Sequence, residues 1–281
     1  MSVQLILVPY DSGHYRKRMG LGPQQIFANG LKELFSRLGL STECEEITLE
    51  TAYPAEISSA FQLAGKLAER VRECRSKGII PVVLSGNCNA ALGTVSGSGA
   101  NELGIVWFDA HGEATTPETT VSGFLDGMGI STLLGRAWHT LAKNIPGFAP
   151  IPGNRIVLFG ARDVEPAERS LLEAAGVLRA ATVGQLQKQL PILTREVNQV
   201  YLHVDLDVLD PKVATANQWT PPNGITLECL LDAIAELRKQ VEVVALGIAS
   251  YDPEADRDRR ALAAALAVTE AVFAGAPTLS S

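Results

Sequence analysis

The sequence has no run of five or six lysines or arginines among its 281 residues, and its net charge is −7. Proteins that bind nucleic acid through phosphate contacts usually carry such a basic patch, so we expect no nucleic-acid partner. An apolar stretch of about 18 residues, which a bilayer requires, is also absent, so we expect no membrane partner. The short apolar run near the start is interpreted as a first strand rather than a signal peptide.

Cysteine is scarce, with four residues and no Cys-x-x-Cys pair. So few cysteines cannot form the disulfide framework that stabilises small secreted domains. We therefore expect a reducing, cytoplasmic location. The glycine-rich stretch 93–104 lacks the Lys-Ser/Thr ending of a phosphate-binding loop and precedes a strand rather than a helix, which argues against a nucleotide site there.

What the chain does have is an alternation of short apolar runs with helical segments. Hydrophobic residues make up 46% and charged residues 20%, which suits a globular core. The alternation is typical of βα units, in which helices cover both faces of a parallel sheet. Strands are expected at 4–8, 80–84, 105–108, 155–159, 200–204 and 243–248, and helices at 23–38, 58–75, 166–175, 227–240 and 258–273. The Pro- and Gly-rich segment 136–154 is interpreted as a surface excursion, so residues 1–281 are expected to form a single domain.

Three potential metal ligands follow the strand expected at 105–108. Asp109, His111 and Glu113 occupy alternate positions, and an extended chain directs alternate side chains to one face. Each could instead be a capping or solvent-exposed residue, but three of them on one face would require a coincidence. Buried charges are rare unless they are paired or bind a metal.

A second cluster follows the strand expected at 200–204. Asp205 and Asp207 would lie on one face, where two like charges repel unless a cation lies between them. Cys88 comes just after the strand at 80–84, and the carboxyl ends of parallel strands meet at one edge of a sheet. The combined set of four carboxylates, one imidazole and one thiol suits two divalent ions about 3.5 Å apart, bridged by carboxylates.

These motifs resemble those of the arginase, agmatinase and formiminoglutamase family, the ureohydrolases. The resemblance covers most of the chain, through GLGP, GNCNAALG, DAHGE, TTPETTVSGFLDGM, DLDVLDP, TPPNGIT and YDP in that order. It implies an arginase-like α/β fold with three αβα layers and a mostly parallel sheet of about eight strands. It also implies two Mn²⁺ ions, hydrolysis of a guanidino or related carbon–nitrogen bond of a small molecule, and a homo-oligomer, either a trimer or a hexamer.

The resemblance also implies a role for each residue of the site. Asp109 and Asp205 would bridge the ions, His111 and Asp207 would bind one, and Cys88 and Glu113 the other. The ions would deliver a hydroxide onto a trigonal carbon. The residues expected to take part in catalysis are His111, Glu113, which would orient the hydroxide, and Asp126, which could carry a proton or be a turn residue beside Gly127. Thr115 and Ser122 would bind the distal end of the substrate, although turn chemistry explains them equally well.

The chain departs from the family pattern at four positions of the expected site. Cys88 stands where the family usually has histidine, and Glu113 where it has aspartate; Asp126 matches the histidine thought to shuttle protons, and Ser250 the glutamate that faces the substrate's guanidinium. In its cysteine the chain looks closer to the branch that hydrolyses N-omega-hydroxy-arginine than to ordinary arginases.

Two of these departures change the metal or the substrate that we expect. A thiolate is a softer ligand than imidazole, so Zn²⁺, Co²⁺ or Fe²⁺ could compete with Mn²⁺. Without a carboxylate at Ser250, a planar cation has no bidentate partner, so the substrate would be neutral or weakly basic, as a hydroxyguanidine, amide or formimino group is. The alternative is a catalytically inactive metal-binding relative with a structural or regulatory role. His203 shares the parity of Asp205, and we interpret it either as a residue that supports the site or as a buried core histidine.

Overall fold

The computed structural model describes residues 2–51 and 55–275, and an eight-stranded sheet runs through its centre. The strand order is β4-β1-β5-β10-β9-β6-β7-β8, and each pair of neighbours is parallel. The strands are β1 (Ser2–Val8), β4 (Ser41–Glu46), β5 (Ile80–Ser85), β6 (Leu103–Phe108), β7 (Ile156–Phe159), β8 (Leu178–Ala180), β9 (Gln199–Asp205) and β10 (Glu242–Ala249). A small antiparallel hairpin, β2 (Tyr10–Asp11) and β3 (His14–Tyr15), follows β1.

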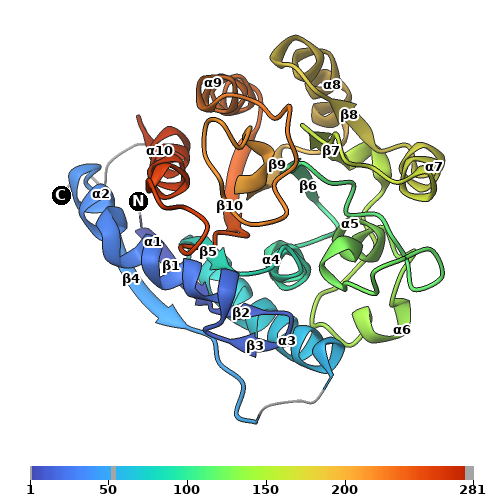
Figure 1. The fold of residues 1–281 in the computed structure, drawn as a ribbon, viewed down its shortest axis with the longest axis horizontal. Coiled ribbons are helices and arrows are strands. Elements are labelled where there is room, and N and C mark those ends of the chain that lie inside the picture. The colour runs from blue at the N-terminus through green and yellow to red at the C-terminus, as the bar shows by residue number, and fades with distance from the viewer. Residues whose placement is uncertain (1, 52–54, 276–281) are drawn as a thin grey trace.

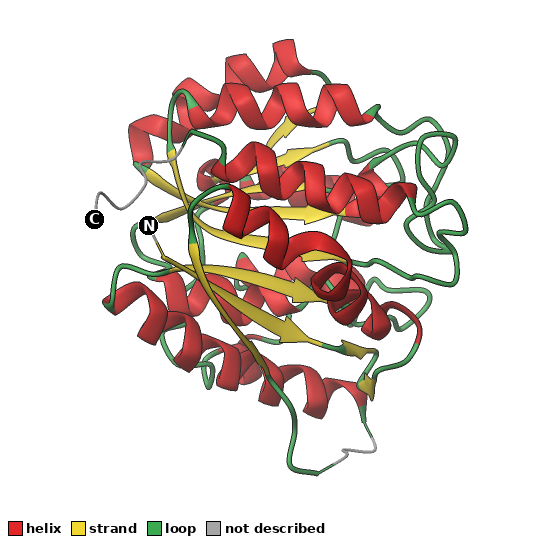
Figure 2. Cartoon of the chain, turned by 90° about the vertical axis from the view of Figure 1, so that its left-hand side faces the viewer, coloured by secondary structure: helices red, strands yellow, loops and turns green. Residues whose placement is uncertain are grey.

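Helices cover both faces of this sheet, which makes the three layers visible in Figure 2. One face packs against α1 (Gly22–Ile26), α2 (Lys32–Arg37), α8 (Val183–Glu196), α9 (Leu227–Arg238) and α10 (Arg260–Phe273). The other packs against α3 (Glu56–Ser76), α4 (Ala90–Ser98), α5 (Gly129–Leu133) and α7 (Pro166–Ala175), while α6 (His139–Ala142) lies in the segment between α5 and β7. The expected three-layer α/β fold with a parallel sheet is confirmed.

The central strands are apolar on both faces because both faces are covered. Every residue of β6 is buried, with Trp107 on the side of α4 and α5 and Phe108 on the side of α9 and α10. A strand covered on one face only would alternate polar and apolar residues instead. Across residues 2–51 and 55–275, none of the helices combines the length and the apolar character needed to cross a membrane.

All six expected strands are present, and the differences lie at the sheet edges and in the helices. The edge strand β4 (sequence STECEE) is largely polar and exposed, and β8 has three residues, so neither carries the apolar run of a buried strand. The helix expected at 23–38 is broken at Asn29 and Gly30, whose φ angles are −112° and 118°. Helix α8 was not predicted; it contains Gly184 and Pro191, and both residues weaken a helical pattern.

The carboxyl ends of the strands all lie on one side of the molecule. In Figure 2 the arrowheads point to the side where the long loops gather, and in Figure 1 that side faces the viewer. Because the strands are parallel, the residues just after β5, β6, β9 and β10 meet at this edge.

The glycines of α4 allow it to pack closely on α3. A Cβ atom at Gly93 would lie 2.5 Å from the carbonyl oxygen of Ala64, and one at Gly97 would lie 2.4 Å from that of Ala68. Neither distance leaves room for a methyl group, so these helices approach through backbone contacts. The glycines of 93–104 that lie in α4 therefore serve helix packing.

We expect Gly93→Ala to lower the free energy of unfolding by about 1 to 3 kcal/mol, because the added methyl group forces α4 away from α3. Gly65→Ala is the matched control, since Gly65 lies in α3 with nothing within 4 Å of its would-be Cβ. That control should stabilise by about 0.5 to 1 kcal/mol, because alanine loses less backbone entropy in a helix. Urea denaturation measures both changes, and equal effects at the two positions would contradict the packing argument.

Candidate metal centre

Four neighbouring strands bring a row of polar side chains to the carboxyl edge of the sheet. In the order β5, β10, β9 and β6, these side chains are Cys88, Ser250, Asp205 and Asp109. All four are at most 4% exposed. The Cys88 Sγ lies 3.0 Å from Asp205 Oδ2, 3.5 Å from Ser250 Oγ and 4.0 Å from Asp109 Oδ2. The expected convergence of Cys88 with the two aspartates is therefore present.

His111 and Asp207 extend this row on the side of Asp109. His111 Nδ1 lies 3.3 Å from Asp109 Oδ1 and 3.1 Å from Asp207 Oδ2. The other oxygen of Asp207 accepts a hydrogen bond of 3.1 Å from the backbone N–H of Ala110. The loops after β6 and β9 are thereby tied together directly beside the site.

Two groups of potential metal ligands result, each with its ligand atoms within 4.8 Å of one another. One consists of Asp109, His111 and Asp207, and the other of Cys88, Asp109 and His203. Asp109 belongs to both. A carboxylate shared by two ligand groups is what a binuclear centre requires.

The chain after β6 and β9 does not stay extended, so the expected alternation is wrong in its geometry. After β9 the segment Leu206–Val208 forms a 3₁₀ turn, in which Asp205 Oδ1 accepts a 2.8 Å hydrogen bond from the backbone N–H of Asp207. After β6, Glu113 has a φ of 52°, in the left-handed region. Tight turns rather than an extended strand direct these side chains to the site.

Glu113 is buried with one carboxylate oxygen unsatisfied. The residue is 6% exposed, and within the described residues its Oε2 has no hydrogen-bond partner. A buried carboxylate oxygen without a partner is costly unless it is neutralised. A cation within reach of Oε2 would remove that cost, so Glu113 fits a metal centre although it is outside the two groups above.

The electrostatics of the site favour added positive charge. Burial, and then repulsion from neighbouring carboxylates, raises the pKa of Asp109, Glu113 and Asp205, and it raises the pKa of the Cys88 thiol in the same way. Asp207 is the exception, because hydrogen bonds from His111 and Ala110 outweigh burial and lower its pKa. A divalent cation would relieve this repulsion, so the donor set fits metal ions.

His111 is the group whose protonation offsets these carboxylates. Burial on its own would lower the pKa of His111, but hydrogen bonds to Asp109 and Asp207 raise it well above its usual value. Binding of a divalent ion requires neutral imidazole, so the ion would displace this proton and take over its charge pairing.

Asp126, in the 3₁₀ turn Asp126–Met128, holds the turn that carries Cys88. Its Oδ2 accepts hydrogen bonds from Asn87 Nδ2 at 2.8 Å and from the Cys88 backbone N–H at 3.1 Å, and its Oδ1 accepts one from the Asn89 backbone N–H at 2.8 Å. Burial raises the pKa of Asp126 to about 7, although these hydrogen bonds oppose the shift. Its role as a proton carrier stays a prediction, but its contacts give it a positioning role.

A cleft of about 750 Å³ lies above these residues. The predicted residues that line it are His111, Glu113, Thr115, Ser122, Asp126, Asp205, Asp207 and Ser250. Cys88 and Asp109 lie beneath its floor, at 1% and 0% exposure. The Thr115 hydroxyl donates to the carbonyl of Gly127, and the exposed Ser122 hydroxyl accepts from the N–H of Phe124, so both contribute to loop structure as well as to the cleft.

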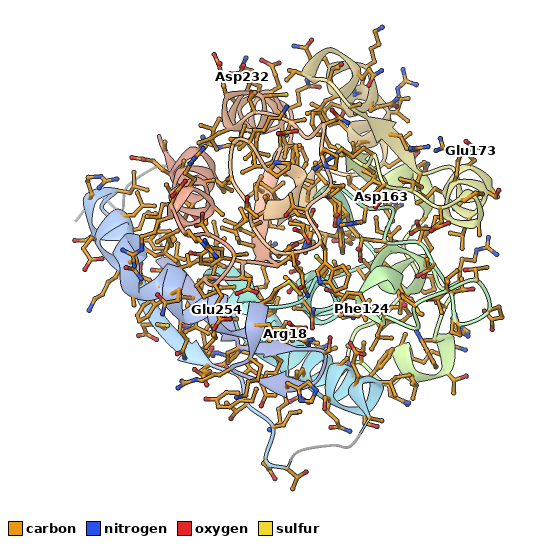
Figure 3. All side chains as sticks on the ribbon, viewed as in Figure 1. Arg18, Phe124, Asp163, Glu173, Asp232 and Glu254 are labelled. Atoms are coloured by element: carbon orange, nitrogen blue, oxygen red, sulfur yellow. The ribbon has the colours of Figure 1, made fainter. Side chains whose placement is uncertain are left out.

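Several residues of the site were not predicted from the sequence. Arg18, Phe124 and Trp219 form part of the cleft wall, and Figure 3 shows Arg18 and Phe124 near the middle of the open face. Trp107 Nε1 donates a 2.8 Å hydrogen bond to Asp109 Oδ2; Trp107 lies on β6 two residues before Asp109, and this shared parity could have indicated the contact. Arg162 donates to five backbone carbonyls. They belong to residues 207–209 and 221–222, which are too distant in sequence for a local signal.

We expect Asp126→Asn to lower the free energy of unfolding by about 1 to 3 kcal/mol, because the new amide group faces N–H donors that now have a carboxylate acceptor. Asp163→Asn is the matched control, since Asp163 is exposed on the same cleft. Chemical denaturation in the presence of a chelator isolates the effect from metal binding. If both variants unfold like the wild type, the carboxylate does not position the Cys88 turn.

Comparison with known proteins identifies the family. The Arginase family model matches residues 1–274. An arginase from Brevibacillus brevis is 28% identical over 300 residues, with 97% of each chain covered, and one from Bacillus subtilis is 30% identical over 232 residues, with 76% of this chain and 77% of the relative covered. The crystal structure of Bacillus subtilis arginase superposes with a TM-score of 0.89 at 26% identity, covering 98% of this chain and 99% of the other.

These matches extend over nearly the whole chain and agree with the ligand groups at the carboxyl edge of the sheet. The chain belongs to the arginase family and is a metal-dependent hydrolase of the ureohydrolase class.

Proposed function

We propose that the chain hydrolyses a carbon–nitrogen bond of a guanidino, hydroxyguanidino or related amidine or amide substrate whose reacting end is neutral or weakly basic. The observation that carries this proposal is the sharing of Asp109 by two ligand groups at the floor of the cleft. A floor of this kind holds two cations side by side beneath a cavity that admits a small molecule.

The proposed centre uses six residues of this chain. Asp109 and Asp205 would be shared by the ions, with His111 and Asp207 on one side and Cys88 and Glu113 on the other. We propose Mn²⁺, with Zn²⁺, Co²⁺ or Fe²⁺ competing at the side of Cys88 because thiolate is a softer ligand. When bound, such ions polarise the substrate and lower the pKa of water.

The remaining chemistry falls to side chains on the cleft. Glu113 has a buried carboxylate oxygen free of hydrogen bonds within the described residues, so it can accept a proton from water and orient it. The pKa of about 7 at Asp126 suits a group that passes a proton near neutral pH, although its oxygens also hold the Cys88 turn. His111 holds its ion, and the hydroxyls of Thr115 and Ser122 bind the distal end of the substrate.

Ser250 supports the choice of a weakly basic substrate. It lines the cleft, its Oγ lies 3.5 Å from the Cys88 Sγ, and its carbonyl accepts a hydrogen bond of 2.8 Å from Asn217 Nδ2. A serine hydroxyl can hydrogen-bond a substrate nitrogen but cannot form the bidentate ion pair that a guanidinium prefers. When the carboxylate is absent, a hydroxyguanidine therefore loses less binding free energy than a guanidinium does.

We expect Ser250→Glu to shift the preference from N-omega-hydroxy-arginine toward arginine by about tenfold in kcat/KM, because the new carboxylate pairs with the guanidinium. Ser170→Glu, on the exposed surface of α7, controls for the added charge. Steady-state kinetics on both substrates measure the ratio. An unchanged ratio in Ser250→Glu would mean that position 250 does not face the reacting end.

The function itself is tested by removing the metal with a chelator, restoring Mn²⁺, Zn²⁺, Co²⁺ or Fe²⁺ singly, and screening guanidino, hydroxyguanidino, formimino and amide compounds. We expect turnover to be lost on chelation and restored by metal, because the ions supply the water activation that hydrolysis requires. Efficient release of urea from arginine would contradict the proposed specificity. Two tightly bound ions without turnover on any compound would favour the inactive relative with a structural or regulatory role.

Three further expectations stay predictions. We propose that residues 1–281 act as a single catalytic domain on a small-molecule substrate. A homo-oligomer, as a trimer or hexamer, and a cytoplasmic location are likewise expected from the resemblance to the family and from the sparse cysteines.

A further inference from the structure

His203 lies at the base of the centre, on β9 two residues before Asp205. It is 1% exposed, and its Nε2 lies 3.1 Å from the Cys88 Sγ. Its other ring nitrogen, Nδ1, lies 2.7 Å from the hydroxyl of Tyr201. The ring also stacks on Trp107, with centroids 3.8 Å apart. The imidazole is thus held from two sides, with Nε2 directed at the sulfur.

We propose that His203 is a metal ligand, and that its Nε2 binds the same ion as Cys88; this inference rests on the binuclear centre proposed above. The side of the centre at Cys88 then offers one sulfur, one imidazole nitrogen and carboxylate oxygens. Nothing in the resemblance to the family assigns a ligand at this position.

The distances carry this assignment. Ligand atoms of Cys88, Asp109 and His203 lie within 4.8 Å of one another, as three donors around one ion must, whereas Glu113 belongs to no such group. Typical zinc–sulfur and zinc–nitrogen bonds of about 2.3 and 2.0 Å would place sulfur and nitrogen slightly farther apart than the 3.1 Å found here. To bind zinc, the Cys88 sulfur and the His203 nitrogen would therefore have to move apart by a fraction of an ångström.

The surroundings of His203 are those of a ligating histidine. A metal-bound imidazole usually engages its second nitrogen in a hydrogen bond that fixes the ring, and Tyr201 supplies that partner. The histidine ligand that the family has at position 88 is a cysteine here, so His203 returns a nitrogen to that side of the centre from the strand beneath it.

The consequence is a centre with two chemically different halves. Cysteine and histidine together with carboxylate form a set that zinc prefers, whereas the half with Asp207 and His111 is dominated by oxygen and suits manganese better. We therefore expect zinc to occupy the side of Cys88 first.

The competing interpretation is that His203 only forms a hydrogen bond to the Cys88 sulfur. That role also explains the 3.1 Å contact and the burial, and loss of such a partner can weaken metal binding about tenfold or more. Affinity alone cannot separate the two roles, so the position of the ion has to be measured.

The test is to load the wild-type protein with one equivalent of Zn²⁺, followed by Mn²⁺, and to locate zinc by anomalous diffraction and by X-ray absorption in solution. We expect zinc about 2.0 to 2.1 Å from His203 Nε2, with one sulfur and one imidazole in its shell. Zinc bound by Cys88 but more than about 3 Å from Nε2 overturns the inference and leaves the proposed function intact. Failure to bind any ion overturns both.

A variant of His203 provides a second test of the ligand role, and this test does not depend on activity. In His203→Gln we expect the imidazole contribution to the zinc absorption spectrum to disappear and zinc to bind at least about tenfold more weakly. His139→Gln, at an exposed histidine of α6, should change neither. An imidazole signal that persists in a folded His203→Gln protein, as judged by its melting transition, contradicts the ligand role.

Discussion

The repulsion between buried carboxylates at one edge of the sheet is the constraint that shapes this protein. Asp109, Asp205 and Asp207 are at most 4% exposed, and Glu113 is 6% exposed. No arrangement of so many negative groups is stable in a low dielectric without counter-charge, so the fold must supply enough stability elsewhere to hold them together. The central strands do so, because they are apolar on both faces and are covered by helices.

The loops that carry the carboxylates are held by hydrogen bonds from residues around the site as well as by the carboxylates themselves. Arg162 gathers five carbonyls around the turn after β9, and Asp126 gathers two backbone N–H groups and the Asn87 amide at the turn after β5. Trp107 holds one oxygen of Asp109 from below. Positions fixed in this way do not depend on attraction between the ligands, which is what a site of like charges needs.

The sequence predicts the central strands and the ligand-bearing edge well, because a strand buried on both faces reads as a continuous apolar run. It does not predict β4, whose exposed polar residues resemble a loop, or the break at Gly30, which depends on a left-handed φ. Residue type and adjacency to a strand end were enough to predict that Cys88 and the aspartates lie close together at this edge. The parity of His203 could not decide whether it is a core residue or a site residue, because either role would direct its side chain to the same side as Asp205. No local sequence signal predicts the contacts of Arg162.

The cleft at the carboxyl edge of the sheet has a floor that the close contact between α3 and α4 helps to fix, and a wall that is formed by loops. Cys88 lies in the turn that leads into α4, so the backbone contacts of Gly93 and Gly97 set its height above the sheet. The wall is less constrained by packing, because Ser122 and Trp219 lie exposed on loops. Substitutions at such positions usually change stability by less than about 0.5 kcal/mol. During divergence, substitutions on the wall can therefore alter the choice of substrate at little cost in stability.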